Sequence, residues 1–124
     1  MRVVIYLSVL FLLGCSAQQT VPVENAELKY NPKAAQINVQ LGANYIASKN
    51  YLAADEKLKR ALQQDPKSSK AHWVYAILQE KLAQPEAAET YYRKALKIDN
   101  KDTSGMYNYA TFLCRHKRYQ ASAG

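Results

Sequence analysis

Two cysteines and two histidines are the side chains of this 124-residue sequence with the most obvious capacity for nucleophilic or metal chemistry. His72 and His116 fall far apart, with no Cys, Asp or Glu set at metal-ligand spacing around them. No Gly-rich phosphate loop, nucleophile elbow or paired-carboxylate motif is present, and the four glycines leave little material for one. We therefore predict a protein that is not an enzyme, with no metal, no cofactor and no small-molecule substrate, and we place His116 in an exposed turn.

Cys15 stands at the end of a segment with the features of a secretory signal peptide. Met1-Arg2 supplies a short basic end, and Val3 to Leu13 is an uncharged apolar run. The run has 11 residues, whereas a helix that crosses a bilayer needs about 20, so a permanent transmembrane anchor is the weaker interpretation. We predict that residues 1–14 form a signal peptide that is removed on export.

The residues Leu12-Leu13-Gly14-Cys15, followed by a polar stretch from Ser16, resemble a bacterial lipobox. The resemblance implies cleavage just before Cys15, a diacylglyceryl group on its thiol and an acyl group on the new amine. Several acyl chains on one residue hold a protein stably at a membrane. Ser16 takes the place where Asp would signal retention, so the sorting rule that accompanies the resemblance favours the periplasmic face of the outer membrane.

Cys114 is the only other thiol, so a lipidated Cys15 leaves it without an intramolecular disulfide partner. We expect it to be buried as a small hydrophobic side chain without a chemical role. The formal net charge of +7 would favour nucleic-acid binding in a cytosolic protein, but an exported chain rarely meets nucleic acid. We interpret the bases as scattered among acids on solvated helical faces and predict no nucleic-acid partner.

Helices must position these groups, because the chain is rich in apolar residues and Tyr and poor in Gly. Residues 15–30 lack a sustained helical period, which predicts a flexible tether that spans roughly 20 Å. Asn31-Pro32 predicts the start of the domain, residues 31–124, because Asn accepts hydrogen bonds from a first helical turn and Pro suits its first position. The first helix is expected to run to about Ser48.

A 34-residue internal repeat is the strongest structural signal in the sequence. Residues 58–67 align with residues 92–101, with four of the ten pairs identical and two exchanging Lys for Arg. The same offset carries Ala53-Ala54 onto Ala87-Ala88. A period of 34 residues indicates tetratricopeptide repeats (TPR), pairs of antiparallel helices that stack into a superhelix with a concave groove. The predicted fold class is therefore all-α, a TPR superhelix.

We place the repeats at residues 35–68, 69–102 and 103–124, the last of them incomplete. Pro85 is expected to open the second helix of the second repeat. About three repeats are needed for stability, and this sequence supplies two and a fragment. Residues 119–124 are too few to hold a helix by themselves, so the last helix pair is expected to fray.

In this repeat family, side chains of the first helix of each pair line the concave groove. The register assigns three sets: Gln36, Val39, Ala43 and Ile46; Lys70, Trp73, Ile77 and Glu80; and Tyr107, Thr111, Cys114 and Arg115. We predict the partner-binding groove from the second and third sets without Cys114.

Trp73 and Tyr107 occupy equivalent positions in successive repeats, so we expect their rings to be neighbours, with Lys70 and Arg115 beside them. Aromatic and Arg side chains suit the capture of a peptide. Burial of Trp73 in the core between the repeats is an alternative of equal weight.

The lipobox, tether and repeats together resemble the type IV pilus biogenesis and stability lipoproteins of the PilF/PilW family. The most specific part is residues 108–119, Asn-Tyr-Ala-Thr-Phe-Leu-Cys-Arg-His-Lys-Arg-Tyr. The resemblance implies a pilotin, a non-catalytic lipoprotein of the outer membrane that binds subunits of the pilus secretin and assists their localisation and assembly. Members of the family carry more repeats, so we interpret the chain as truncated at its C-terminus.

Two other functions stay open at the level of sequence. One is a periplasmic TPR scaffold for another envelope machine, such as outer-membrane protein assembly or peptidoglycan synthesis. The other is the targeting part of a peptidoglycan-active enzyme, which would need a catalytic domain beyond Gly124. Pull-down of the secretin separates the first from a pilotin, and the downstream DNA sequence tests the second.

Overall fold

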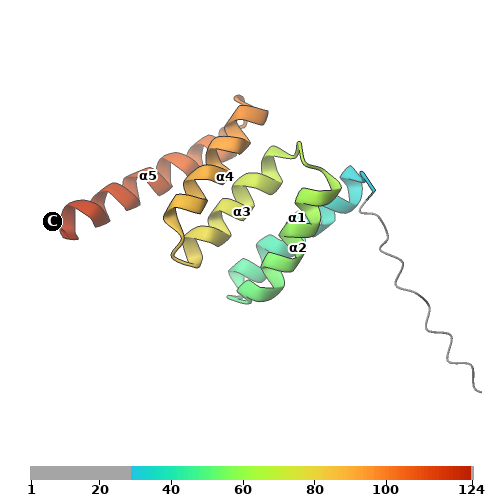
Figure 1. Cartoon of the computed structure of the whole chain (residues 1–124), viewed down its shortest axis with the longest axis horizontal. Coiled ribbons are helices and arrows are strands. Elements are labelled where there is room, and N and C mark those ends of the chain that lie inside the picture. Colours follow the sequence, from blue (N-terminus) through green and yellow to red (C-terminus); the bar gives the residue numbers. More distant parts are fainter. Residues whose placement is uncertain (1–28, 124) are drawn as a thin grey trace, which may run out of the picture.

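Residues 29–123, the part of the chain that the structure describes, contain five helices in a computed structural model. They are α1 (Pro32–Ala47), α2 (Tyr51–Gln64), α3 (Ser69–Lys81), α4 (Pro85–Ile98) and α5 (Thr103–Ala123). Two antiparallel pairs, α1 with α2 and α3 with α4, stack side by side, and α5 packs on α3 and α4 with its C-terminal part extending outward (Figure 1). Cys15, the predicted signal peptide and most of the predicted tether lie outside the described residues.

Local capping chemistry sets where the helices begin. The Asn31 side chain accepts a hydrogen bond from the Ala34 amide at 3.0 Å, and Asn50 and Ser68 cap α2 and α3 in the same way. A cap of this kind satisfies one of the amides that the first helical turn leaves free. Pro85 is the first residue of α4, where no side chain caps the helix. The starts of α1 and α4 that the sequence predicts are thus confirmed.

The turns inside the two helix pairs repeat each other at the 34-residue period. Lys49 and Ala83 adopt positive φ values of 61° and 56°, a left-handed conformation that commonly ends a helix. In the first turn the Asn50 amide donates to the Tyr45 carbonyl at 2.9 Å, and the equivalent bond in the second turn is also 2.9 Å long. The internal repeat therefore extends from the sequence to the backbone conformation of single residues.

The core consists of two clusters of buried side chains. One cluster joins α1, α2 and α3, and the other joins α3, α4 and α5. Trp73, Ile77 and Tyr91 pack against both clusters and so connect the two helix pairs. The helices α1 and α2 lie close together at Gly42, where an added Cβ would lie 2.5 Å from Cγ of the fully buried Leu58.

The end of the helical array differs from the prediction. We expected a turn at His116, but α5 runs through this residue as one helix to Ala123; fraying of the last helix pair stays a prediction. The physical reason is that nucleation is the costly step of helix formation, and these last residues extend a helix that already exists. Lys117 is the position equivalent to Lys49 and Ala83, and a turn there would require a strained positive φ. Within residues 29–123 no second helix packs after Lys117 to offset that cost.

Candidate partner-binding groove

The first-repeat set of groove residues is largely part of the core. Val39 and Ile46 are 2% and 9% exposed and belong to the first cluster. Ala43 is half-buried and packs against the same cluster, while Gln36 is exposed. On α1, Gln36 is thus the member of the set that is open to solvent, and accessible groove residues come mainly from α3 and α5.

Trp73 holds the repeats together. Its half-buried side chain packs against both core clusters, and its indole N–H donates to Oδ2 of Asp102 at 2.9 Å. Gly105 approaches the ring so closely that an added Cβ would lie 3.0 Å from it. The alternative in which Trp73 belongs to the packing between repeats therefore has direct structural support, and its accessible edge is what remains for a partner.

Asp102 is a structural residue that the sequence reasoning missed. Its carboxylate also accepts from the Ser69 hydroxyl at 2.8 Å and from the Gly105 amide at 2.9 Å. Burial acts to raise the pKa of Asp102, but the hydrogen bonds from Gly105, Ser69 and Trp73 outweigh it and leave the pKa lowered. Asp102 thereby joins α3 to the start of α5. Its position just before Thr103-Ser104 is the helix-capping signal that could have indicated this role.

The third-repeat set lies on the open side of α5. Tyr107 is 74% exposed, Thr111 is half-buried and its hydroxyl donates to the Tyr107 carbonyl at 2.8 Å. Cys114 is exposed, so the expectation of a buried thiol is wrong. Cys114 lies on a side of α5 that no other helix among residues 29–123 covers. Within that same range the aromatic ring contacts do not pair Trp73 with Tyr107.

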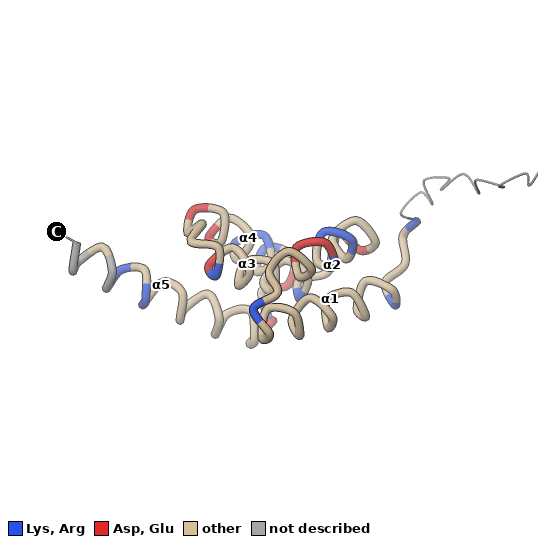
Figure 2. Tube along the Cα trace, turned by 90° about the horizontal axis from the view of Figure 1, so that it is seen from below, with Lys and Arg blue, Asp and Glu red and all other residues tan. Residues whose placement is uncertain are grey.

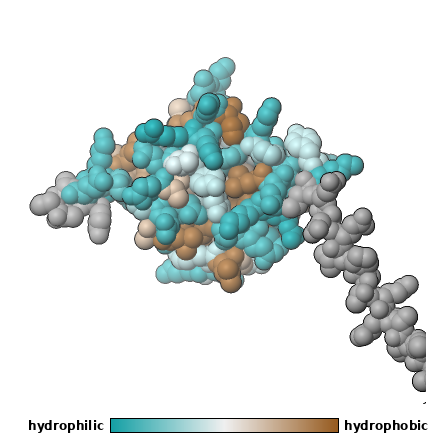
Figure 3. Space-filling model, viewed as in Figure 1, coloured by the Kyte–Doolittle hydropathy of each residue, from teal (hydrophilic) through white to brown (hydrophobic). Residues whose placement is uncertain are grey.

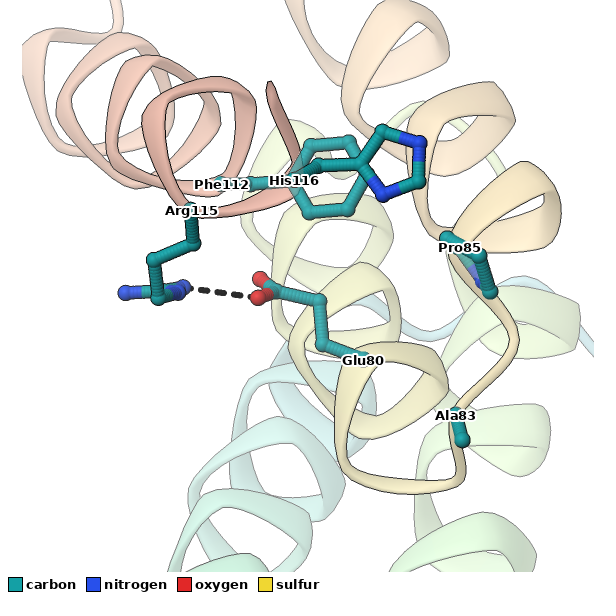
Figure 4. A pocket seen from close by; sticks show the side chains of 6 residues that line it. All are labelled: Glu80, Ala83, Pro85, Phe112, Arg115 and His116. Atoms are coloured by element: carbon teal, nitrogen blue, oxygen red, sulfur yellow. Dashed lines mark hydrogen bonds and ion pairs between the residues drawn. The ribbon is translucent and has the colours of Figure 1, made fainter. Parts of the chain in front are cut away.

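Glu80 and Arg115 are predicted groove residues that the structure brings together. Nη2 of Arg115, on α5, lies 2.6 Å from Oε2 of Glu80, on α3, as Figure 4 shows. The Tyr92 hydroxyl donates to the other oxygen of Glu80. The hydrogen bond from Arg115 thus adds to a carboxylate that is already held in place, and the three side chains tie α3, α4 and α5 together.

Two clefts flank this ion pair. The first, about 340 Å3 in volume, is lined by Ile77, Glu80, Lys81, Asn108 and Arg115. It therefore unites three of the predicted groove residues with two neighbours that the register did not select. Lys70 is exposed near the start of α3 and does not line this cleft.

The second cleft, about 410 Å3, is more apolar and is lined by Glu80, Ala83, Pro85, Phe112, Arg115 and His116 (Figure 4). Phe112 is 3% exposed, and the His116 ring stacks on it with centroids 5.5 Å apart. His116 belongs to this helical wall because α5 continues through the position where a turn was expected. On the face that Figure 3 shows, apolar residues form small areas separated by hydrophilic ones.

The first and second helices of the TPR pairs differ in their charged residues, a difference that was not predicted from the sequence. The first helices α1, α3 and α5 contain the bases Lys33, Lys70, Lys81, Arg115, Lys117 and Arg118, with Glu80 as their single acid. The second helices α2 and α4 mix both signs. Figure 2 shows α1 and α5 without an acidic residue along one side of the molecule. The interpretation of bases scattered among acids is therefore wrong for the first helices.

The described residues contain no cluster of three or more His, Cys, Asp or Glu side chains that could hold a metal ion. Among the helices of residues 29–123, none is both long and apolar enough to cross a membrane.

Comparison with known proteins agrees with the helix-pair architecture. Residues 45–104 match the tetratricopeptide repeat family. The match, the stacked helix pairs and the 34-residue turns define the fold as a TPR array, and the predicted fold class is confirmed. TPR arrays present extended concave surfaces that bind other proteins.

Within this class, the chain is similar to the type IV pilus assembly protein PilF of Pseudomonas aeruginosa (strain PAO1). The two are 35% identical over 92 residues, which make up 74% of this chain and 36% of that protein. A solved structure of Pseudomonas aeruginosa PilF superimposes with a TM-score of 0.66 and 36% identity over 70% of this chain and 39% of that one.

Two further proteins are similar to this chain over part of their length. An uncharacterised protein of Haemophilus influenzae (strain Rd) is 30% identical over 87 residues, or 49% of its length. A Caenorhabditis elegans protein O-mannosyl-transferase is 27% identical over 97 residues, but these are only 14% of that protein. The chain thus spans less than half the length of each of these relatives.

Proposed function

We propose that this protein is a non-catalytic scaffold of type IV pilus assembly that binds subunits of the pilus secretin and assists their localisation and assembly. The observation that carries the proposal is the 35% identity to a type IV pilus assembly protein over 74% of the chain. Chemical turnover plays no part in the proposed activity, which consists of docking and release.

The proposed site of action is the periplasmic face of the outer membrane, with Cys15 as the lipid-bearing residue. The support comes from the sequence, in which Cys15 follows an apolar run and a small Gly14 and precedes polar residues. Acyl chains on Cys15 would hold the chain at the membrane. The tether would let the groove reach secretin subunits some distance from the surface.

The proposed docking surface is the α3–α5 side of the array, centred on the Glu80–Arg115 pair. Ile77 and Lys81 line the first cleft there, and Tyr107 is exposed nearer the start of α5. Aromatic and Arg side chains are enriched among the residues that dominate binding energy in protein interfaces. We therefore expect Tyr107→Ala to weaken secretin binding while leaving helix content unchanged.

The test uses a strain that lacks the gene and produces the secretin, complemented with the full chain or with single variants. The expected results are secretin recovered with the wild-type chain, heat-resistant secretin multimers in the outer-membrane fraction, and loss of that localisation with Cys15→Ala. Palmitate incorporation should depend on Cys15. A full chain that restores neither the multimers nor secretin recovery would contradict the proposal.

A further inference from the structure

The α3–α5 cleft contains one acid, Glu80, and both of its carboxylate oxygens already accept hydrogen bonds within the protein. The cleft is lined by Ile77, Glu80, Lys81, Asn108 and Arg115. Oε2 of Glu80 accepts from Arg115 at 2.6 Å, and Oε1 accepts from the Tyr92 hydroxyl. The Glu80 side chain is only 14% exposed. A ligand that enters the cleft therefore meets a Glu80 carboxylate whose charge is already compensated by the ion pair with Arg115.

The two cations of the cleft retain capacity for a ligand. The Arg115 side chain is 60% exposed, and among residues 29–123 it makes a single hydrogen bond, to Glu80. A guanidinium has five N–H donors, so most of them face the cleft or solvent. Lys81 is exposed and takes part in none of the ion pairs formed within the described range.

The surroundings favour an anionic ligand with an apolar part. The first helices that flank the cleft contain bases and, apart from Glu80, no acid, so the local field attracts negative charge. Ile77 supplies a half-buried apolar wall, and the Asn108 side chain is half-buried at the opposite wall. A uniform polyanion would gain nothing from the apolar surface of Ile77.

We propose that the α3–α5 cleft binds an acidic peptide segment whose carboxylate contacts Lys81 and Arg115 together while a neighbouring apolar side chain packs on Ile77. The Asn108 amide is the group that can hydrogen-bond the peptide main chain. The inference rests on the proposed function, in which this side of the array receives a protein, and it adds the chemistry of the segment that is recognised.

The test measures fluorescence anisotropy of dye-labelled ten-residue peptides with the purified full chain. The peptides contain fixed Leu residues and Glu at varied positions, and each has a matched version with Gln in place of Glu. We expect binding to require Glu beside Leu and the Gln versions to bind about tenfold more weakly, because charge-assisted hydrogen bonds are lost. Binding should weaken as salt concentration rises.

Variants of the protein locate the effect. Lys81→Gln and Arg115→Gln should each weaken binding of the Glu peptide about tenfold and should hardly change binding of the Gln peptide, the signature of a direct contact in a double-mutant cycle. Lys97→Gln, which removes an exposed base from α4, is the matched control and should have no effect. Lys81→Gln keeps the test decisive if Arg115→Gln perturbs the fold, because Lys81 has no ion pair to lose.

The inference is overturned if the Gln peptides bind as well as the Glu peptides, if no peptide binds, or if Lys97→Gln matches Lys81→Gln. Tighter binding of a fifteen-nucleotide oligothymidylate or of phosphatidylglycerol vesicles, with the same dependence on Lys81, would also overturn it. If acidic peptides bind but the secretin does not, the acidic-peptide site is supported and the secretin is rejected as the partner. If the secretin binds equally well to the Lys81→Gln variant, the secretin is supported as the partner and the acidic-peptide site is rejected.

Discussion

At the scale of single residues, Gly42 and Leu58 set how closely α1 and α2 approach. A Cβ at Gly42 would lie 2.5 Å from Cγ of Leu58, a distance that forces the leucine or the helix to move. Gly→Ala in a helix interior normally stabilises by up to about 1 kcal/mol, but overpacking a core costs about 1–3 kcal/mol. We predict that Gly42→Ala lowers the free energy of unfolding in urea titrations.

The Gly42 prediction has an internal control in the partner residue. Leu58→Ala alone should destabilise by about 2–5 kcal/mol because it leaves a cavity. In the double variant the new methyl group partly fills that cavity, so the two effects should not add. Simple additivity, or a stabilised Gly42→Ala protein, would show that the contact with Leu58 does not limit the approach of the helices.

Asp102 carries a pH dependence that can be assigned to one carboxyl group. Its hydrogen bonds lower its folded-state pKa despite partial burial, so the stabilisation is fully present above the unfolded-state pKa of about 3.9. It is lost as the pH falls through the lower, folded-state pKa. We predict that Asp102→Asn destabilises the protein at pH 7 and that this difference shrinks in acid. The single Trp, Trp73, reports unfolding by fluorescence; a difference independent of pH would contradict the assignment.

At the scale of helices and turns, the positive φ of Ala83 is a local cost that can be removed. A left-handed conformation costs a residue with a Cβ roughly 1–2 kcal/mol, and Gly avoids most of it. We predict that Ala83→Gly raises the melting temperature measured by circular dichroism. The same chemical change at Ala110, exposed in the interior of α5, should lower the free energy of unfolding by about 1 kcal/mol. Equal signs for the two variants would contradict the role of the turn.

The sequence predicts the elements of this fold well because the signals are local. Asn31 and Pro85 mark helix starts through capping and backbone preference, and the 34-residue period identifies the helix pairs. The turn at His116 was wrongly predicted, because the repeat pattern around this residue indicates a turn whose stability depends on packing by a following helix. Register alone could not foresee such packing.

The candidate site was only partly predictable for a related reason. Register identified Glu80 and Arg115 as groove residues but not their ion pair, since their contact depends on how α5 lies on α3. The structure likewise shows that Trp73 serves packing between repeats, through a hydrogen bond to Asp102, a residue 29 positions away. The excess of bases in the first helices could have been predicted from the sequence by counting the charges of first and second helices separately.

At the scale of the whole molecule, two core clusters become one cooperative unit through the residues that touch both. Trp73, Ile77 and Tyr91 form this connection, and a repeat array unfolds as one unit only while the coupling between neighbours is strong. The described array has few repeats, so loss of one connecting side chain should affect cooperativity as well as stability.

We predict that the wild-type chain unfolds in one transition, with helix content and Trp73 fluorescence changing together. Ile77→Ala should separate the two signals, because each cluster then responds to denaturant more independently. Leu62→Ala is the control, since Leu62 packs against the first cluster but not the second; it should lower the midpoint while the signals still coincide. Coincident transitions in Ile77→Ala would mean that Trp73 and Tyr91 suffice for coupling. The groove between α3 and α5 depends on that coupling for its shape, so Ile77→Ala should also weaken partner binding at denaturant concentrations below the unfolding transition.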